Sequence, residues 1–235
     1  MDNIYGVIAA GGLGTRLRDF EENKTTKVLI DINGQSMISM QIDQLYNWGV
    51  ENFIVITNPE FHDLIVKDLN KNYPDLKIDF ISQISPKGIA DALSYASGFT
   101  SNKSKIIFVL GDNFFGNNPL RDINLDKISG AHIFLKEVIN PEEFGVVEVS
   151  NDKVVMLHEK PKEFISSLAV VGLYIYDKSC FEMIKTLQPS NRGELEITDL
   201  NKLYMNKGQL THSTLDSWWV DAGTKERIIE LRRLL

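Results

Sequence analysis

Short apolar runs alternate with stretches of helical periodicity through the first half of the chain, and this alternation restricts the fold strongly. Four runs rich in β-branched residues predict strands, at 3–10, 52–58, 77–83 and 104–113. The segments between them predict helices, at 36–50, 59–73 and 88–99. Uninterrupted apolar strands joined by helices indicate a parallel sheet covered by helices on both faces. In such a sheet, ligands bind beyond the carboxyl ends of the strands.

The second half of the chain has closely spaced strand signals instead. Strands are predicted at 131–138, 144–150, 153–160, 169–177 and 209–216. Helical spacing predicts helices at 179–188, 194–208 and 225–235. Closely spaced strands favour a meandering or mixed sheet, and no linker or repeat divides the sequence. We therefore expect one α/β domain over 1–235, with a mostly parallel mixed sheet and a smaller β-rich lobe.

Composition narrows the classes of function. The 235-residue chain has a formal net charge of −7, whereas nucleic-acid-binding surfaces are basic, so no nucleic-acid partner is expected. No signal peptide and no apolar run near the ~20 residues of a membrane helix are visible, so no membrane partner is expected either. The single cysteine, Cys180, excludes an intrachain disulfide and fits a core position in a cytoplasmic protein. The four histidines lack zinc-ligand spacing.

A glycine-rich stretch, GGLGTR at residues 11–16, follows the first predicted strand. Glycines allow backbone N–H groups to approach phosphate oxygens, and Arg16 adds a planar cation suited to phosphate. The stretch fits neither the P-loop pattern nor G-x-G-x-x-G, in which Leu17 would have to be glycine. The segments Gln83–Gly88 and Gly111–Asn113 follow other strands, so we expect them at the same edge of the sheet.

A longer series of motifs is more specific than the glycines alone. The chain contains, in order, AAGGLGTRL, Lys27, SPKGIADAL, LGDN, EEFGVVEV, EKP, VVGLYIYD, RGELEITDLN and WWVDAGT. Together they resemble the signature of the sugar-phosphate nucleotidyltransferases, and LGDN and RGELEITDLN look most like the branch containing glucose-1-phosphate thymidylyltransferase. The resemblance implies a Rossmann-like nucleotide-binding half at about 1–115 and a sugar-phosphate-binding half at about 116–235.

This resemblance implies transfer of a nucleotidyl group from an NTP to a sugar 1-phosphate, with glucose 1-phosphate favoured, giving an NDP-sugar and pyrophosphate. An oxygen of the sugar phosphate attacks the α-phosphorus in line with the leaving pyrophosphate, so the site must neutralise two anions. Fixed cations and a Mg²⁺ cofactor meet this demand. The implied catalytic residues are Arg16, Lys27, Asp112 and Lys160. The expected Mg²⁺ ligands are Asp112, at the carboxyl end of a strand, and Asp221.

The expected binding residues fall into two groups. The nucleotide group is Ala10, Gly11, Gly12, Gly14, Thr15, Arg16, Gln83, Pro86, Gly88 and Asp112. In it, the amide of Gln83 both donates and accepts, which complements the O4/N3–H edge of thymine or uracil and favours dTTP or UTP. Gly88 would let the base lie against the backbone. By resemblance, the sugar-phosphate group is Gly145, Glu159, Lys160, Val170, Tyr174 and Arg192.

The chain departs from the family pattern at several points. The acidic segment 19–23 lies where a proline and apolar residues are usual, and Asp31 stands where a proline is common. Phe144 stands where related enzymes often have a tyrosine, and the lost hydroxyl could alter sugar preference. The thymidylyltransferase branch continues beyond the last predicted helix with helices for subunit contacts and a regulatory nucleotide site. We therefore expect that form of feedback to be absent, and the oligomeric state, including a homo-oligomer, stays open.

Alternative interpretations remain at this level. Within the same class, CTP or GTP could serve as the nucleotide for another sugar 1-phosphate. A catalytically silent nucleotide-sugar sensor and an NAD(P)-dependent Rossmann oxidoreductase are alternatives from other classes. Taken singly, Asp112 also fits a turn or helix cap, Gln83 an ordinary strand end, and Lys27 a solvated loop charge.

Overall fold

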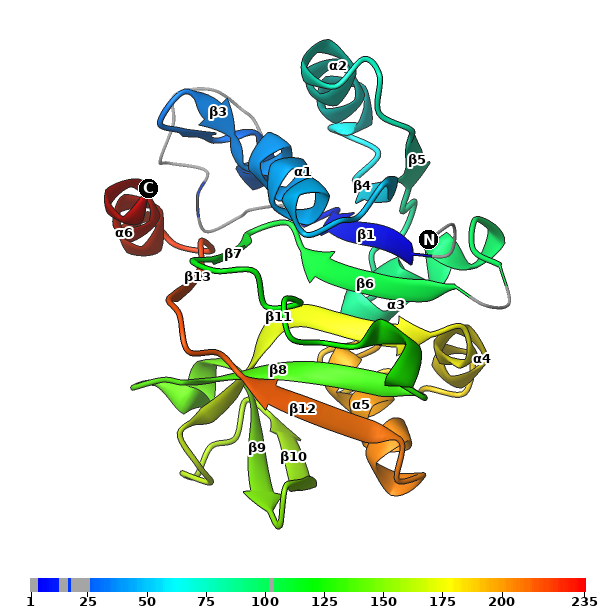
Figure 1. Cartoon of the computed structure of the whole chain (residues 1–235), viewed down its shortest axis with the longest axis vertical. Helices are drawn as coiled ribbons and strands as arrows, with labels where there is room; N and C mark the ends of the chain where they lie inside the picture. The colour runs from blue at the N-terminus through cyan, green and yellow to red at the C-terminus, as the bar shows by residue number, and fades with distance from the viewer. Residues whose placement is uncertain (1–3, 13–16, 18–25, 102–103) are drawn as a thin grey trace.

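Figure 1 shows a computed structural model of the chain, which describes residues 4–12, 17, 26–101 and 104–235. Within these residues, nine strands form one central sheet. They are β1 (Ile4–Ala10), β4 (Asn52–Thr57), β5 (Ile78–Ser82), β6 (Lys105–Leu110), β8 (Ala131–Glu137), β9 (Gly145–Ser150), β10 (Lys153–Glu159), β11 (Leu168–Asp177) and β12 (Leu210–Thr214). This sheet confirms the predicted α/β class.

The strands of the first half are parallel, as predicted, and lie in the order β5-β4-β1-β6. Their sequences are continuously apolar because both faces of the sheet are covered. On β1, for example, Val7 and Ile8 are both fully buried, but they belong to separate hydrophobic clusters on opposite faces. The carboxyl ends of these strands therefore open together at one edge of the sheet.

The strands of the second half extend the same sheet in mixed orientation. The long strand β11 is antiparallel to β6, β8 and β9, whereas β12 is parallel to β8. β10 forms an antiparallel pair with β9 at the far end of the sheet. β11 thus connects the two halves of the chain through backbone hydrogen bonds rather than through side chains alone.

Helices cover the two faces of the sheet (Figure 1). α1 (Met37–Asn47) and α2 (His62–Asn72) pack on one face, and α3 (Ile89–Ser94), α4 (Ser179–Ile184) and α5 (Ile197–Asn206) pack on the other. α1 begins where the hydroxyl of Ser36 accepts a hydrogen bond from the N–H of Ser39 at 3.2 Å, and Gly49 follows its end in a left-handed conformation. No helix within the described residues is long and apolar enough to span a membrane.

Two small strand pairs complete the fold beside α6 (Lys225–Leu234). β7 (Asn113–Phe115) pairs with β13 (Trp219–Asp221), and β2 (Asp31–Ile32) pairs with β3 (Gln35–Ser36) around an Asn33-Gly34 turn. Both turn residues have positive φ, as the sequence predicts for this dipeptide. The β7–β13 pair brings the end of β6 next to a segment more than a hundred residues later.

Several predicted helices are longer than the observed ones: α2 begins at His62 and α4 ends at Ile184, for example. Two further differences have an identifiable form or cause. The 88–99 helix is α-helical only to Ser94 and continues as a 3₁₀ turn over Tyr95–Gly98. The 194–208 helix begins at Ile197, because Glu196 is extended and the backbone of Leu195 is hydrogen-bonded elsewhere. Its N–H donates to the carbonyl of Lys87 at 2.6 Å, and its carbonyl accepts from the N–H of Ala90 at 3.1 Å.

Candidate active site

The carboxyl ends of β1, β5 and β6 carry three of the predicted segments. Gly11 and Gly12 follow Ala10 at the end of β1, Gln83 follows β5, and Asp112 lies between β6 and β7. These segments meet, since a Cβ on Gly11 would lie 3.0 Å from Oε1 of Gln83. The predicted phosphate residues Gly14, Thr15 and Arg16 lie outside the described residues.

The side chain of Lys27 passes next to Gly12 and contacts Asp112. Its ammonium group contacts Oδ2 of Asp112, and a Cβ on Gly12 would lie 3.2 Å from Cε of Lys27. Gly12 thus leaves space for the lysine stem. Burial raises the pKa of Asp112, but the charge and hydrogen bond of Lys27 outweigh burial, so the net pKa is below its ordinary value. Lys27 is therefore a partly buried member of an ion pair with Asp112 and not a solvated loop charge.

Asp221 lies beside Asp112 at the end of β13. In the β7–β13 pair, Asp221 is opposite Asn113, and the N–H of Ala222 donates to the carbonyl of Asp112 at 2.7 Å. A Cβ on Gly223 would lie 3.0 Å from Oδ1 of Asp221 and 3.8 Å from Oδ2 of Asp112. The two carboxylates therefore approach the same small volume next to Gly223, as expected for a pair of metal ligands.

The side chain of Asn113 holds this region together. Its Oδ1 accepts hydrogen bonds from the N–H of Gly172 on β11 at 3.0 Å and from Nε1 of Trp219 at 2.8 Å, while its Nδ2 donates to Oδ1 of Asp112 at 3.0 Å. Gly172 has to be glycine, because a Cβ there would lie 2.6 Å from Cγ of Asn113. One buried amide thus orients Asp112 and connects β7, β11 and β13.

The predicted base-recognition segment follows β5. Gln83 is buried, and its Nε2 donates to Oδ2 of Asp91 at 2.6 Å. Pro86 lies in the exposed loop before α3. Gly88 has a φ of 107°, and a Cβ there would lie 2.6 Å from the carbonyl oxygen of Leu195. Position 88 thus requires glycine because the backbone of Leu195 lies so close. The local sequence around Gly88 does not reveal this contact.

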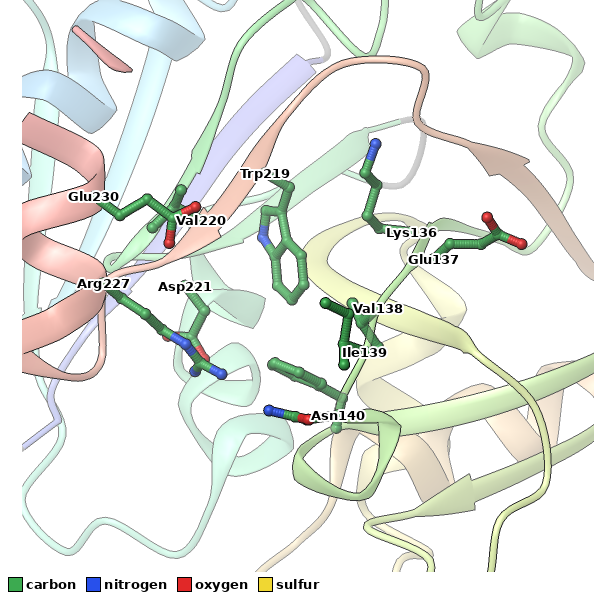
Figure 2. Close-up of a pocket in the computed structure, with 11 residues that line it drawn as sticks. Lys136, Glu137, Val138, Ile139, Asn140, Trp219, Val220, Asp221, Arg227 and Glu230 are labelled. Atoms are coloured by element: carbon green, nitrogen blue, oxygen red, sulfur yellow. The ribbon is translucent and has the colours of Figure 1, made fainter. Parts of the chain in front are cut away.

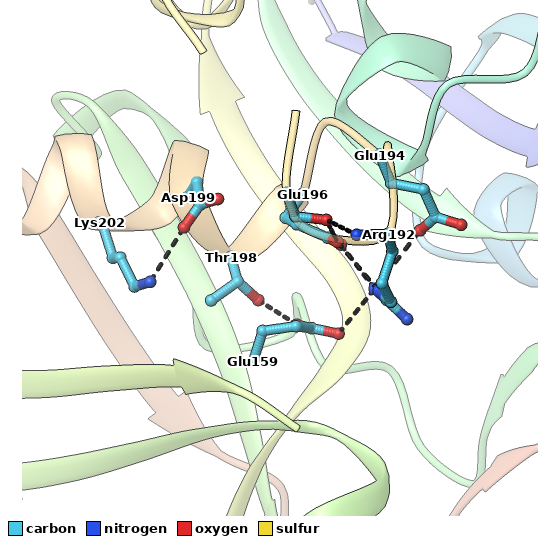
Figure 3. A network of polar contacts seen from close by, with 8 residues as sticks. Glu159, Arg192, Glu194, Glu196, Thr198, Asp199 and Lys202 are labelled. Carbon is cyan, nitrogen blue, oxygen red and sulfur yellow. Dashed lines mark hydrogen bonds and ion pairs between the residues drawn. The ribbon is translucent and has the colours of Figure 1, made fainter. Parts of the chain in front are cut away.

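Several residues of the predicted sugar group meet around Glu159 (Figure 3). Glu159 ends β10, and its Oε2 accepts a hydrogen bond from Oγ1 of Thr198 at 2.5 Å. A Cβ on Gly145 would lie 3.1 Å from that hydroxyl, 3.5 Å from the same carboxylate oxygen and 4.0 Å from Cβ of Val170. The absence of a side chain at Gly145 thus leaves room for the Thr198 hydroxyl and the Glu159 carboxylate between β9, β10 and α5.

Arg192 lies next to Glu159, and carboxylates surround its guanidinium group (Figure 3). Its Nε and Nη2 donate to the two carboxylate oxygens of Glu196 at 3.1 and 2.7 Å, and Nη2 also lies 3.4 Å from Glu159 and 3.4 Å from Glu194. The hydrogen bond with Glu196 contributes most to raising the pKa of Arg192. Lys160 is exposed and adopts a positive φ of 44° directly after Glu159.

Tyr174, another residue of the predicted sugar group, is buried on β11. Burial, followed by the negative charges of Glu159 and Asp221, raises its pKa, so it stays a neutral phenol.

A cavity of about 290 Å³ opens on the outer side of Asp221 (Figure 2). Figure 2 shows Arg227 beside Asp221, and its Nη1 lies 3.5 Å from Oδ2 of that carboxylate. The Nη2 of Arg227 is 2.6 Å from Oε2 of Glu143, and the guanidinium lies 5.3 Å above the ring of Phe144. Phe144 in turn packs edge-on against Trp219. Arg227 thus connects Asp221 to the loop that precedes β9.

Sequence reasoning missed four residues that support the site: Asp91, Asn113, Thr198 and Glu196. All four lie within or next to the quoted motif strings, but their local patterns resemble solvated turns or helix starts. Asn113 could have been found, because a polar residue at the end of a buried strand requires a hydrogen-bonding partner. Nothing local to Thr198 indicates its partner Glu159, 39 residues earlier, and the pattern around Asp91 fits an ordinary helix start.

Comparison with known proteins places this arrangement in a family. The sequence matches the Nucleotidyl transferase family over residues 5–235, almost the whole chain. The chain belongs to the nucleotidyl transferase family. It is an enzyme of this class, and the resemblance and the function class expected from the motifs are confirmed.

Relatives within this family include two bacterial enzymes of the same name. Glucose-1-phosphate thymidylyltransferase of Neisseria meningitidis serogroup A is 37% identical over 97% of this chain and 81% of its own length. The enzyme of that name from Mycolicibacterium smegmatis is 33% identical over 97% of this chain and 80% of its own length.

Two solved structures share the fold of this family member. A crystal structure of a protein assigned as a glucose-1-phosphate thymidylyltransferase from Bacillus anthracis, in complex with a sucrose, superimposes with a TM-score of 0.90 at 35% identity. That match covers 98% of this chain and 94% of the other. UDP-glucose pyrophosphorylase complexed with UDP-glucose has a TM-score of 0.85 at 19% identity, covering 98% and 97% of the two chains. The second likeness concerns the fold alone.

Proposed function

We propose that this enzyme transfers a thymidylyl or uridylyl group from dTTP or UTP to glucose 1-phosphate, releasing pyrophosphate. The observation that supports this most directly is the convergence of Lys27, Asp112 and Asp221 beside the Gly11-Gly12 backbone. The names of the relatives support glucose 1-phosphate as the acceptor. With a single buried thiol, Cys180, we expect the protein to act in a reducing compartment such as the cytoplasm.

The reaction proceeds by in-line displacement at the α-phosphorus. A phosphate oxygen of glucose 1-phosphate forms the new P–O bond as the bond to pyrophosphate breaks, and pyrophosphate leaves with the electron pair. The acceptor phosphate is already a nucleophile at neutral pH, so no side chain has to form a covalent intermediate. The protein contributes by holding two anions together and by stabilising charge on the leaving group.

Lys27 supplies positive charge at the proposed reaction centre, next to Asp112. Its ammonium contacts Asp112 and lies over Gly12, so a triphosphate on the glycine backbone would be within reach of the same group. A lysine can exchange one anionic oxygen for another because its charge is compact and its stem is flexible. We therefore assign Lys27 to the triphosphate, together with Arg16 and the backbone around Gly12 and Gly14.

The residues present fit Mg²⁺. Asp112 and Asp221 offer hard oxygen ligands on one side of Gly223, and no group of three or more His, Cys, Asp or Glu side chains with metal-site spacing occurs within the described ranges. Two carboxylates suit an ion that keeps water and phosphate oxygens in its shell, whereas a structural zinc site needs four protein ligands. When bound at Asp112 and Asp221, Mg²⁺ would offset charge on the triphosphate.

The sugar phosphate is assigned to the region around Glu159. The carboxylate of Glu159 can accept hydrogen bonds from sugar hydroxyls, and Gly145 lies beside it. We assign Lys160, which follows Glu159 in the chain, and Arg192, which lies 3.4 Å from its carboxylate, to the 1-phosphate. Val170 and the neutral phenol of Tyr174 are assigned to the sugar.

A matrix of dTTP, UTP, CTP and GTP against several sugar 1-phosphates, scored by pyrophosphate release with Mg²⁺, tests this proposal. Turnover of dTTP or UTP with glucose 1-phosphate is the expected result. Fast turnover with CTP or GTP alone would replace the nucleotide assignment. Nucleotide binding without turnover for any pair would indicate a sensor instead of an enzyme acting on these substrates.

A further inference from the structure

The amide of Gln83 is held in a confined position at the proposed base site. Gln83 is 3% exposed, and its backbone N–H donates to the carbonyl of Thr57 at 2.9 Å, which extends the pairing of β4 with β5. The backbone of Gly11 packs against the Oε1 end of the amide, as the 3.0 Å between Oε1 and a Cβ built on Gly11 shows. The side chain therefore has little freedom to move away.

Asp91 fixes which end of the Gln83 amide faces Gly11. Nε2 of Gln83 donates to Oδ2 of Asp91 at 2.6 Å. An ionised carboxylate only accepts hydrogen bonds, so the NH₂ group has to face Asp91 and Oε1 has to face Gly11. With the amide reversed, two acceptor oxygens would be in contact. Within the described part of the chain, Oε1 accepts no hydrogen bond, and it is not among the fully buried polar atoms that lack a partner, so it stays accessible to a ligand.

In this orientation the Gln83 amide presents a fixed pair of hydrogen-bonding groups. Oε1 is an acceptor, and Nε2 keeps one N–H beyond the one used by Asp91. Thymine and uracil present an N3–H donor next to a carbonyl acceptor, which matches this pair. Cytosine presents an N3 acceptor next to an amino donor, so it matches only the reversed amide. A base that leaves buried polar groups unpaired is rejected more strongly than one that lacks an apolar contact.

We propose that Asp91 is a positioning residue that sets pyrimidine selectivity: by locking the amide of Gln83, it favours dTTP and UTP over CTP. Asp91 does not touch the nucleotide in this proposal and acts only through Gln83. The inference rests on the proposed nucleotidyl transfer and adds the physical basis of its nucleotide choice. Its location in the first turn of α3 explains why the sequence alone does not reveal it, since an acidic residue there also fits a helix start.

The test compares Asp91→Asn and Asp91→Ala with the wild type. The dissociation constants of dTTP and CTP are measured by calorimetry with Mg²⁺ and no sugar phosphate, and kcat/KM is measured for both nucleotides with glucose 1-phosphate. The preference for dTTP over CTP should fall about tenfold in each variant, the factor associated with one hydrogen bond. Asp63→Asn, at an exposed position in the first turn of α2, is the matched control and should keep the wild-type ratio.

A double-mutant cycle shows whether Asp91 acts through Gln83. Gln83→Leu removes the amide, so the preference for dTTP should be lost, and adding Asp91→Asn should change the ratio no further. Unchanged dTTP-to-CTP ratios in folded Asp91→Asn and Asp91→Ala proteins would overturn the inference. An additional loss of preference on the Gln83→Leu background would overturn it too.

The binding measurements separate this inference from the proposed function. If the wild type releases no pyrophosphate with any substrate pair, the proposed reaction fails, while the ratio of dissociation constants still decides the role of Asp91. If the wild type binds dTTP and CTP equally, the inference is wrong even where turnover is observed.

Discussion

The ammonium group of Lys27 contacts the carboxylate of Asp112, a residue 85 positions later in the chain. Side chains from a 3₁₀ turn and from the end of β6 are thereby joined directly above the Gly12 backbone. The side chain of Asp112 is 10% exposed and that of Lys27 is 20% exposed, so this pair is only partly screened by water. In the proposed reaction, this pair would pre-position a cation for phosphate and a carboxylate for a metal ion.

Replacing Asp112 by alanine should abolish metal-dependent turnover while the protein still folds. We expect kcat to fall about 10³-fold, because a principal carboxylate for the metal ion is lost. The melting temperature should also fall, since Lys27 loses its partner. Pyrophosphate release and circular dichroism check the two effects, with Asp122→Ala at an exposed position as the control. Near-normal turnover in Asp112→Ala would refute the metal assignment.

Lys27→Met should reduce kcat/KM about 100-fold while retaining the length of the side chain. The loss reflects the missing charge at the triphosphate, not altered packing. Steady-state kinetics with varied nucleotide measure the change, and Lys67→Met on the exposed side of α2 is the control. Equal losses in both variants would mean that the effect is one of overall charge.

Arg227→Lys keeps a positive charge but cannot contact Asp221 and Glu143 together. We expect the Mg²⁺ concentration for half-maximal activity to rise about tenfold, as for other residues that orient metal ligands. Titration of activity with Mg²⁺ at saturating substrates measures this shift. Arg233→Lys, on the exposed end of the same helix, should leave the Mg²⁺ curve in place. A change in nucleotide KM without a shift in the Mg²⁺ curve would argue against a positioning role.

Gly88→Ala should destabilise the fold more than the same exchange at Gly98. The new Cβ would meet the carbonyl oxygen of Leu195 at 2.6 Å, in a backbone conformation with φ of 107°. We expect a loss of about 2–3 kcal/mol in the free energy of unfolding. Gly98→Ala, where nothing lies within 4 Å of the added Cβ, is the matched control. Denaturant titration measures both, and equal midpoints would contradict the prediction.

The stability of the protein should decrease between pH 7 and pH 4 because of His132. Burial, and then the nearby His212, lower the pKa of His132 from 6.5 to about 4 in the folded state. Between these values the unfolded chain binds the proton and the folded chain does not, so the free energy of unfolding falls as the pH drops below 6.5. The full effect is about 3 kcal/mol and is complete near pH 4.

His132→Gln tests this pH dependence. It should flatten this part of the stability profile, measured by denaturant titration at several pH values, whereas His158→Gln at an exposed position should not. A wild-type slope retained in His132→Gln would assign the acid sensitivity to other groups.

The fold was predictable to the extent that its signals are local. β1, β4, β5 and β6 were found because continuous β-branched runs indicate strands buried on both faces. The start of α5 was not found, because Leu195 makes its backbone hydrogen bonds with Lys87 and Ala90, about a hundred residues away. The local pattern of apolar residues cannot indicate a contact between segments so far apart in sequence.

The candidate site was predictable in its first half and less so in its second. The rule that ligands bind at the carboxyl ends of parallel strands was sufficient to bring Gly11, Gln83 and Asp112 together. The position of Asp221 was expected only by resemblance, since it depends on the pairing of β13 with β7. Thr198 was missed because its partner, Glu159, lies 39 residues earlier in the chain. Asp91 was missed because an acidic residue in the first turn of a helix is common without a binding role.

Asn113 has a consequence for how the enzyme acquires activity. Its side-chain oxygen accepts a hydrogen bond from Nε1 of Trp219, 106 residues further along the chain. Asp221 lies on the same strand as Trp219. The parallel strands of the first half can collapse earlier, but the metal carboxylates meet only once β13 has docked, a late step of high contact order. During refolding, the recovery of catalysis should therefore lag behind the burial of the first core, and a chain interrupted before β13 would be compact and inert.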